Sequence, residues 1–145
     1  MIHKLVHILL ASSLLISCVS QEQKAQECLQ TIALINQESP DVTASVMATP
    51  SAANQSASQL EQLAQKLTQL KGKDSGLAQV RNKSASVYRE LAEALRNQAA
   101  AADALNRNPL DVKKQAAAQA VNAKTSEVLA KKDEVTRQLK NQCGV

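Results

Sequence analysis

Leucine and alanine recur at spacings of three and four through the middle of this chain. After Pro50 the series reads Ala53, Ala57, Leu60, Leu63, Leu67 and Leu70. This spacing places all six on one helix face and is typical of the seams along which helices pack in bundles and coiled coils. Similar series over residues 77–105 and 118–139 predict two further helices, each of roughly thirty residues. The sequence therefore predicts an all-α fold.

Capping residues indicate where the helices begin and end. The expected N-caps are Ser20, Thr49, either Asp74 or Ser75, and Asn108, with Pro50 and Pro109 as first helical residues. Gly72 is expected to terminate the helix that starts at Pro50. The last two helices are then expected to end near Asn106 and Gln142.

A shorter apolar stripe predicts one more helix directly after residue 20. Its members are Ala25, Cys28, Leu29, Ile32 and Ile35. Residues 37–49 then break the helical period, and their Pro, Ser and Thr content predicts a loop. Because Val42, Val46 and Met47 make this loop more apolar than a plain linker, it either packs on the protein's own core, which we favour, or contacts a partner.

Four helices with short connections favour an up-down-up-down four-helix bundle. Its last two helices exceed the first two in length, so they are expected to project as an antiparallel hairpin. The projecting part pairs the alanine-rich residues 98–102 and 115–120. Alanine favours helix strongly but buries little apolar area, so this tip is expected to be helical and loosely packed.

The first eighteen residues carry a processing signal. Met1–Lys4 is short and positive, and the apolar run Leu5–Ile16 is too short to span a hydrocarbon core of ~30 Å as a helix. The following site is Leu15-Ile16-Ser17-Cys18, with leucine at −3, a small residue at −1 and then cysteine. The segment resembles the lipobox of bacterial lipoproteins, which signal peptidase II recognises.

That resemblance implies a lipid anchor. The thiol of Cys18 would receive diacylglycerol, residues 1–17 would be removed, and the new amino terminus would be acylated, for example with palmitate. Residues 18–145 would form one lipid-anchored domain at a bacterial membrane, facing the periplasm, a lumen or the cell exterior. The alternatives are an ordinary secretory signal cut after Ser20 and an uncleaved anchor.

Two cysteines, Cys28 and Cys143, remain beyond the lipobox. In an oxidising compartment an even pair most simply forms one disulfide, and both cysteines continue apolar stripes of their predicted helices. The alternative is two thiols packed as small hydrophobes. We favour the disulfide and expect a structural role, because no C-x-x-C spacing is present.

Composition excludes several functions. His3 and His7 lie in the leader, so the mature chain would lack histidine, the commonest general base and metal ligand. Tyr88 is the only aromatic residue and is expected at the core or its boundary, and no glycine-rich phosphate loop occurs. Removing the leader takes away Lys4 and no acid, which lowers the formal charge from +4 to +3. We expect no enzyme, no metal, no cofactor and no nucleic-acid partner.

Several lysines are expected near the lipid-bearing end of an up-down-up-down bundle. This basic set is Lys66, Lys71, Lys73, Lys131, Lys132 and Lys140. It could adhere to anionic headgroups, but acidic neighbours favour an ordinary solvated surface. Glu90 and Glu93 share a helix face and are likewise expected to be solvated, with arginines nearby.

The expected function is therefore non-enzymatic. The leading hypothesis is a membrane-anchored interaction or structural subunit that binds a protein partner or forms a homo-oligomer. The alternative is a carrier of lipids or small molecules with a cavity between its helices, although a core of leucine, valine, isoleucine and alanine argues for tight packing.

Overall fold

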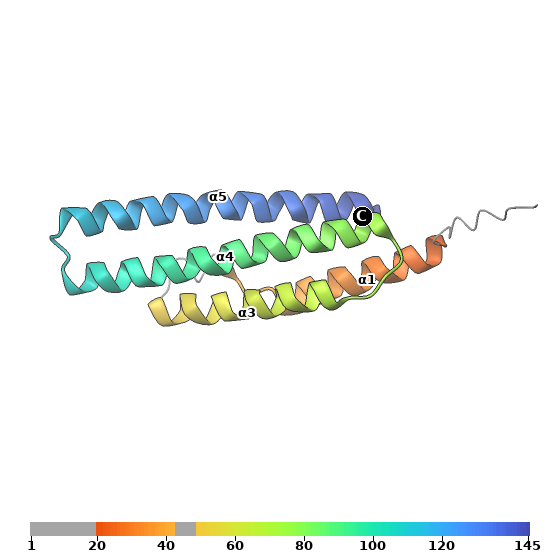
Figure 1. Cartoon of the computed structure of the whole chain (residues 1–145), viewed down its shortest axis with the longest axis horizontal. Coiled ribbons are helices and arrows are strands. Elements are labelled where there is room, and N and C mark those ends of the chain that lie inside the picture. The colour runs from red at the N-terminus through yellow and green to blue at the C-terminus, as the bar shows by residue number, and fades with distance from the viewer. Residues whose placement is uncertain (1–19, 43–48) are drawn as a thin grey trace, which may run out of the picture.

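The computed structural model describes residues 20–42 and 49–145. These residues contain four helices, namely α1 (Gln21–Glu38), α3 (Pro50–Gln69), α4 (Ser75–Arg107) and α5 (Val112–Cys143), and no strand. Successive helices run in opposite directions, so the protein is an all-α, up-down-up-down four-helix bundle (Figure 1). The predicted fold class is confirmed.

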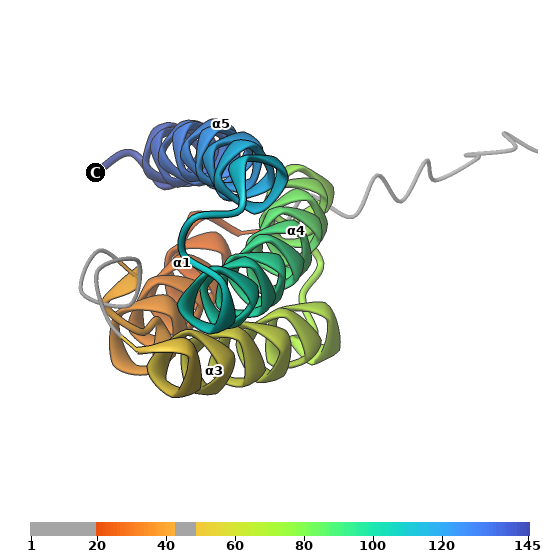
Figure 2. The same ribbon diagram turned by 90° about the vertical axis from the view of Figure 1, so that its left-hand side faces the viewer.

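The central element of the bundle is α4. It packs extensively against α3 on one side and α5 on the other, while α1 makes few contacts, mostly with α3 (Figure 2). As a result α1 covers only one end of the molecule. At that end the start of α1, the α3–α4 turn and the last residues of α5 come together.

The helix lengths produce the predicted projecting hairpin. α4 and α5 have 33 and 32 residues, whereas α1 and α3 have 18 and 20. At 1.5 Å per residue the long pair extends for about 50 Å and the short pair for about 30 Å. The turn between α4 and α5 lies beyond the first residue of α3, at the end of the molecule opposite the start of α1 (Figure 1).

Side-chain caps fix the helix starts. The side chains of Ser20, Thr49 and Asp74 accept hydrogen bonds from the backbone amides of Gln23, Ala52 and Leu77, which confirms the first two caps and selects Asp74 over Ser75. These bonds satisfy amides that have no partner within the helix.

The predicted start of the last helix was wrong. Asn108 is the C-cap of α4, and the N-cap of α5 is Asp111, whose Oδ1 accepts from the amides of Lys113 and Lys114 at 2.9 and 3.2 Å. Asp111 is the better N-cap because its carboxylate accepts hydrogen bonds from two amides at once and is stabilised by the positive end of the helix dipole. Pro109 therefore lies in the turn.

Gly72 does not terminate α3 as predicted. That helix ends at Gln69 with Leu70 as its C-cap, two residues earlier. Among the described glycines only Gly144, the C-cap of α5, has a positive φ, at 72°. The left-handed C-cap therefore falls at the end of α5, and Gly72 serves a different purpose that is described below.

The core follows the leucine seam of α3. Leu60, Leu63 and Leu67 are at most 1 % exposed and pack against the central face of α4, where Leu91 and Leu95 are fully buried. Tyr88 belongs to this cluster and is 1 % exposed, as expected for a core residue. Burial raises the pKa of its hydroxyl to about 12 because the phenolate would lose its hydration.

The predicted stripe of α1 was partly wrong. Leu29 is 68 % exposed, and the buried residues of this helix are Glu27, Cys28 and Thr31. Two of these three are polar, and Thr31 donates a hydrogen bond to the carbonyl of Glu27 at 2.8 Å. α1 therefore turns a more polar face to the bundle than its apolar spacing predicts.

Part of the predicted loop over residues 37–49 packs on the protein itself. α1 continues to Glu38, and Val42 is 4 % exposed within the main core cluster. This burial agrees with the interpretation that we favoured for this segment. Val46 and Met47 lie outside the described residues.

Candidate functional site

The most densely connected part of the molecule is the end at which α1 begins. The residues of the lipobox, Leu15, Ile16, Ser17 and Cys18, lie outside the described residues. Cys18 precedes the first helical residue, Gln21, by only three positions in the sequence. A lipid on Cys18 would therefore sit close to this end of the bundle. We call the end formed by the start of α1, the α3–α4 turn and the last turn of α5 the anchor end.

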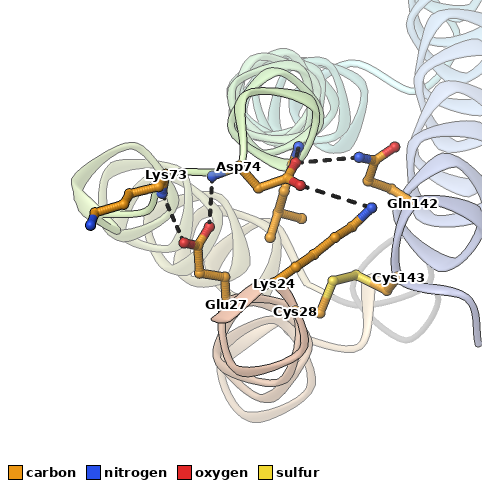
Figure 3. Close-up of polar contacts among 8 residues, drawn as sticks. Lys24, Glu27, Cys28, Lys73, Asp74, Gln142 and Cys143 are labelled. Carbon is orange, nitrogen blue, oxygen red and sulfur yellow. Dashed lines mark hydrogen bonds and ion pairs between the residues drawn. A yellow bond between two sulfur atoms is a disulfide. The ribbon is translucent and has the colours of Figure 1, made fainter. Parts of the chain in front are cut away.

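Glu27 joins α1 to the α3–α4 turn. Its carboxylate is buried and accepts hydrogen bonds from the backbone amides of Lys73 at 2.8 Å and Asp74 at 3.4 Å (Figure 3). Backbone amides stabilise a buried carboxylate without a side-chain cation in contact. This role could not be predicted from the sequence, because Glu27 is one of several acids in a polar stretch.

Asp74 connects three helices. Its Oδ1 caps α4 by accepting from the amide of Leu77 at 2.6 Å and also accepts from the side-chain amide of Gln142 on α5 at 3.4 Å. Its Oδ2 lies 3.8 Å from Nζ of Lys24 on α1. Figure 3 shows all three contacts converging on this one carboxylate. A simple cap contacts only the helix that it caps. Because Asp74 also contacts Lys24 and Gln142, it helps to position α1 and α5 as well.

The disulfide between Cys28 and Cys143 lies beside these polar contacts (Figure 3). It joins the two ends of the described sequence across 115 positions, with Cα atoms 5.7 Å apart. Cys28, Leu77 and Leu139 form a small apolar cluster of their own, distinct from the main core. The predicted pairing of the cysteines is therefore present in the structure.

The basic set does not form one continuous patch. Lys71 and Lys73 lie in the α3–α4 turn, and Lys140 lies in the last turn of α5, so these three are at the anchor end. The others are paired with acids, Lys66 with Glu38, Lys131 with Glu90 and Glu127, and Lys132 with Asp133. Adhesion to headgroups through this set stays a prediction.

Gly72 lies between two buried charged side chains. A Cβ atom at this position would stand 2.2 Å from Oε2 of Glu27 and 2.9 Å from Nη2 of Arg81. A side chain there would force the ends of Glu27 and Arg81 to shift, so this close approach favours glycine. Arg81 is only 3 % exposed, and the sequence did show a signal for it. It occupies a position of the α4 seam, four residues after Leu77 and three before Ser84.

Paired acids on the helix surfaces are solvated ion pairs, as predicted for Glu90. A hydrogen bond from Arg96 lowers the pKa of the exposed Glu61 carboxyl, and one from Lys124 lowers the pKa of the exposed Glu127 carboxyl. Both pairs lie at the surface. Within residues 20–42 and 49–145, no group of three or more His, Cys, Asp or Glu side chains is arranged to hold a metal ion.

The tip of the α4–α5 hairpin has the opposite character from the anchor end. The last buried residue of α4 is Ala99, and the first of α5 is Thr125. Between them Leu110 is 87 % exposed and Val112 is 75 % exposed. The alanine-rich sequence predicted a loosely packed tip, but it did not single out these two large apolar side chains.

No described protein family, curated protein or solved structure matches this chain. In the part of the chain that the structure describes, no helix combines the length and apolarity needed to cross a membrane. The two ends of the bundle, one heavily connected and one without a core, are therefore the features from which a function can be argued.

Proposed function

We propose that this protein is a membrane-anchored lipoprotein that acts as a non-enzymatic interaction or structural subunit at a bacterial membrane surface. The observation that carries this proposal is the display of Leu110 and Val112 at the end of the molecule opposite the anchor end. With a lipid on Cys18, the hairpin would hold these side chains about 50 Å from the membrane-proximal end. Leu110 and Val112 are two positions apart in the sequence, and contiguous exposed apolar surface can mark an interaction site.

The connections at the anchor end support the same proposal. A lipid holds only the first residue of the mature chain, and α1 has few contacts with the rest of the bundle. The disulfide and the contacts of Glu27 and Asp74 join that helix to α4 and α5. They would transmit the position of the anchor to the projecting hairpin, which suits a structural subunit more than a tethered enzyme.

A pulldown from the membrane fraction tests this proposal. The native chain would be compared with Cys18→Ala and with the double variant Leu110→Ser/Val112→Ser, and bound proteins would be identified by mass spectrometry. We expect native protein to carry lipid on Cys18 and to recover a defined partner, which the tip variant loses while it stays in the membrane. Leu29→Ser, which changes an exposed leucine on α1, is the matched control and should keep the partner.

Two results would contradict the proposal. Recovery of the native chain in the soluble fraction, without lipid and without a bound partner, would show that it is not membrane-anchored. A partner that binds the tip variant and the native chain equally would show that Leu110 and Val112 are not the contact surface.

A carrier of small apolar molecules is the second candidate, and one observation favours it. A crevice of ≈ 220 Å³ lies between α1 and α5 and is lined by the apolar residues Ile32, Ile35, Leu139 and Val145 among others. Ligand pockets usually enclose about 300–1,000 Å³, so this crevice is small for a carrier. Mass spectrometry of gently purified protein would reveal a bound ligand and so favour the carrier.

A further inference from the structure

Arg81 is a buried charge that faces the carboxylate of Glu27 without forming an ion pair with it. Oε2 of Glu27 and Nη2 of Arg81 lie 2.2 and 2.9 Å from the same point beside Gly72, so they are no more than about 5 Å apart. The side chain of Arg81 is 3 % exposed on the central helix α4. Among the described residues it forms no hydrogen bond and no ion pair, in contrast to Glu27, whose carboxylate is held by two backbone amides. A guanidinium has five donors and is always charged, so its burial without an acceptor is unfavourable. Its nitrogens are not sealed from solvent, so an acceptor can reach them from outside the chain.

The guanidinium lies at the wall of a pocket. A cavity of ≈ 260 Å³ at the α3–α4 turn is lined by Lys71, Gly72, Arg81 and Asn82, with Leu67 and Thr68 on the α3 side. Nη2 of Arg81 lies 2.9 Å from the point that a Cβ of Gly72 would occupy, so the charged head reaches this wall. The carboxylate of Glu27 occupies the space that a side chain at Gly72 would need, with its Oε2 2.2 Å from the same point.

The chemistry of the lining selects an anion. The residues around the pocket include two cations, Lys71 and Arg81, and no acid. Lys71 and Asn82 likewise use none of their side-chain donors on another described residue. The nearest described carboxylate, that of Glu27, approaches Gly72 and already accepts two backbone amides. Its negative charge reduces the positive potential of the pocket but does not enter the lining.

We propose that this pocket binds a phosphate group, with Arg81 as the main ligand and Lys71 and Asn82 completing the contacts. A planar guanidinium can donate two parallel hydrogen bonds to the oxygens of a phosphate, and an ammonium beside it adds a second charge. The α3–α4 turn, which contributes Lys71 and Gly72 to the pocket, lies at the anchor end (Figure 1). The phosphate could therefore belong to a phospholipid headgroup, which would rest on the proposed membrane anchoring, or to a free phosphorylated molecule.

Thermal unfolding of the full-length chain in a phosphate-free neutral detergent tests this site. One arm compares inorganic phosphate with chloride at equal ionic strength, and the second compares micelles containing phosphatidylglycerol with micelles containing diacylglycerol. We expect phosphate or phosphatidylglycerol to raise the melting temperature above its control. A response to inorganic phosphate alone identifies a free phosphate as the source, and a response to phosphatidylglycerol identifies a headgroup.

Three variants make the test specific. Arg81→Gln should weaken phosphate binding at least about tenfold in a calorimetric titration, because it removes the charge-assisted donors. Lys71→Gln changes an exposed residue of the pocket rim and should weaken binding by about threefold without affecting the fold. Arg107→Gln is the matched control, because it removes the same charge from the far end of α4, where Arg107 is exposed, and should bind like the unaltered chain.

The proposal is overturned if neither arm stabilises the unaltered protein, or if Arg81→Gln, Lys71→Gln and Arg107→Gln respond as it does. If Arg81→Gln fails to fold, the comparison of phosphate binding by Lys71→Gln and by Arg107→Gln still tests the proposal. The phosphate arm can also be run on Cys18→Ala, which needs no lipid. A lack of stabilisation by phosphate would contradict the phosphate site but not the membrane anchor. Conversely, a loss of membrane attachment in Cys18→Ala would not bear on the phosphate site.

Discussion

Removal of the Cys28–Cys143 disulfide tests how the first helix is held. The double variant Cys28→Ala/Cys143→Ala leaves no thiol at either position. α1 has three buried residues and few contacts with the other helices, so its attachment depends strongly on this bond. The cysteines are separated by 115 positions, and in the chain-entropy model a loop of that size stabilises the folded state by about 5 kcal/mol.

That free energy is large enough to measure in two ways. If the free energy of unfolding falls by about 2 kcal/mol per molar of urea, the unfolding midpoint should fall by about 2.5 M. For a chain of this size the melting temperature should fall by about 15 °C. Circular dichroism would follow both transitions, and native protein in excess reductant should reproduce the variant. Cys18→Ala, which removes the other cysteine and keeps the disulfide, is the control and should unfold like the unaltered protein.

Hydrogen exchange locates the effect within the structure. In the double variant the amides of α1 should exchange much faster, while those of α4 near Leu91 keep their protection, because α3, α4 and α5 share the main core. Unchanged protection of α1 together with an unchanged urea midpoint would refute the reasoning. It would show that the contacts of Glu27 and Asp74 are sufficient to hold the helix.

Three further measurements test the core and the surface charges. Tyr88 is the only aromatic residue, so its ultraviolet titration is free of overlapping signals. Its pKa should be about 12 in the folded chain and near 10 in urea. The stability that its burial contributes should therefore be present below about pH 10 and lost as the pH rises towards 12. Leu63→Ala should destabilise the protein by about 3 kcal/mol in urea unfolding, since Leu63 is fully buried, whereas Leu29→Ala should change stability by less than about 0.5 kcal/mol because Leu29 is 68 % exposed. The hydrogen bond from Arg96 lowers the pKa of Glu61, so the pair contributes stability above the unfolded pKa of the carboxyl, near 4.3, and this stability is lost as the pH falls. Glu61→Gln should therefore show a smaller fall in melting temperature between about pH 5 and pH 3 than the unaltered protein. An equal fall in both proteins would contradict the pairing.

Much of the fold could be predicted because its determinants are local. The spacing of Leu60, Leu63 and Leu67 gave the buried face of α3, and Thr49 and Asp74 cap helices where their types predict. Prediction failed where two local signals competed. Asn108 and Asp111 can both cap a helix, and the choice depends on the chain geometry of the turn, which the sequence does not show directly.

The site was less predictable because its contacts join distant parts of the sequence. The disulfide could be inferred, since only two cysteines lie beyond the lipobox and the predicted export of the chain favours their pairing. Glu27 could not, because its partners are backbone amides of residues 73 and 74, which carry no type-specific signal. Arg81 gave a weak signal as a charged residue within an apolar seam, yet only the structure shows that Gly72 opens the space beside it.

The two ends of the bundle differ in what stabilises them, and this difference bears on the function. At the anchor end a disulfide, a cap that contacts three helices and a buried carboxylate fix α1, α4 and α5 relative to one another. Between Ala99 and Thr125 no side chain is buried, so the tip depends on helix propensity and on partly buried alanines. A partner that covers Leu110 and Val112 would supply the apolar contacts that the tip lacks. With the proposed lipid on Cys18, the anchor end would set where that contact forms relative to the membrane.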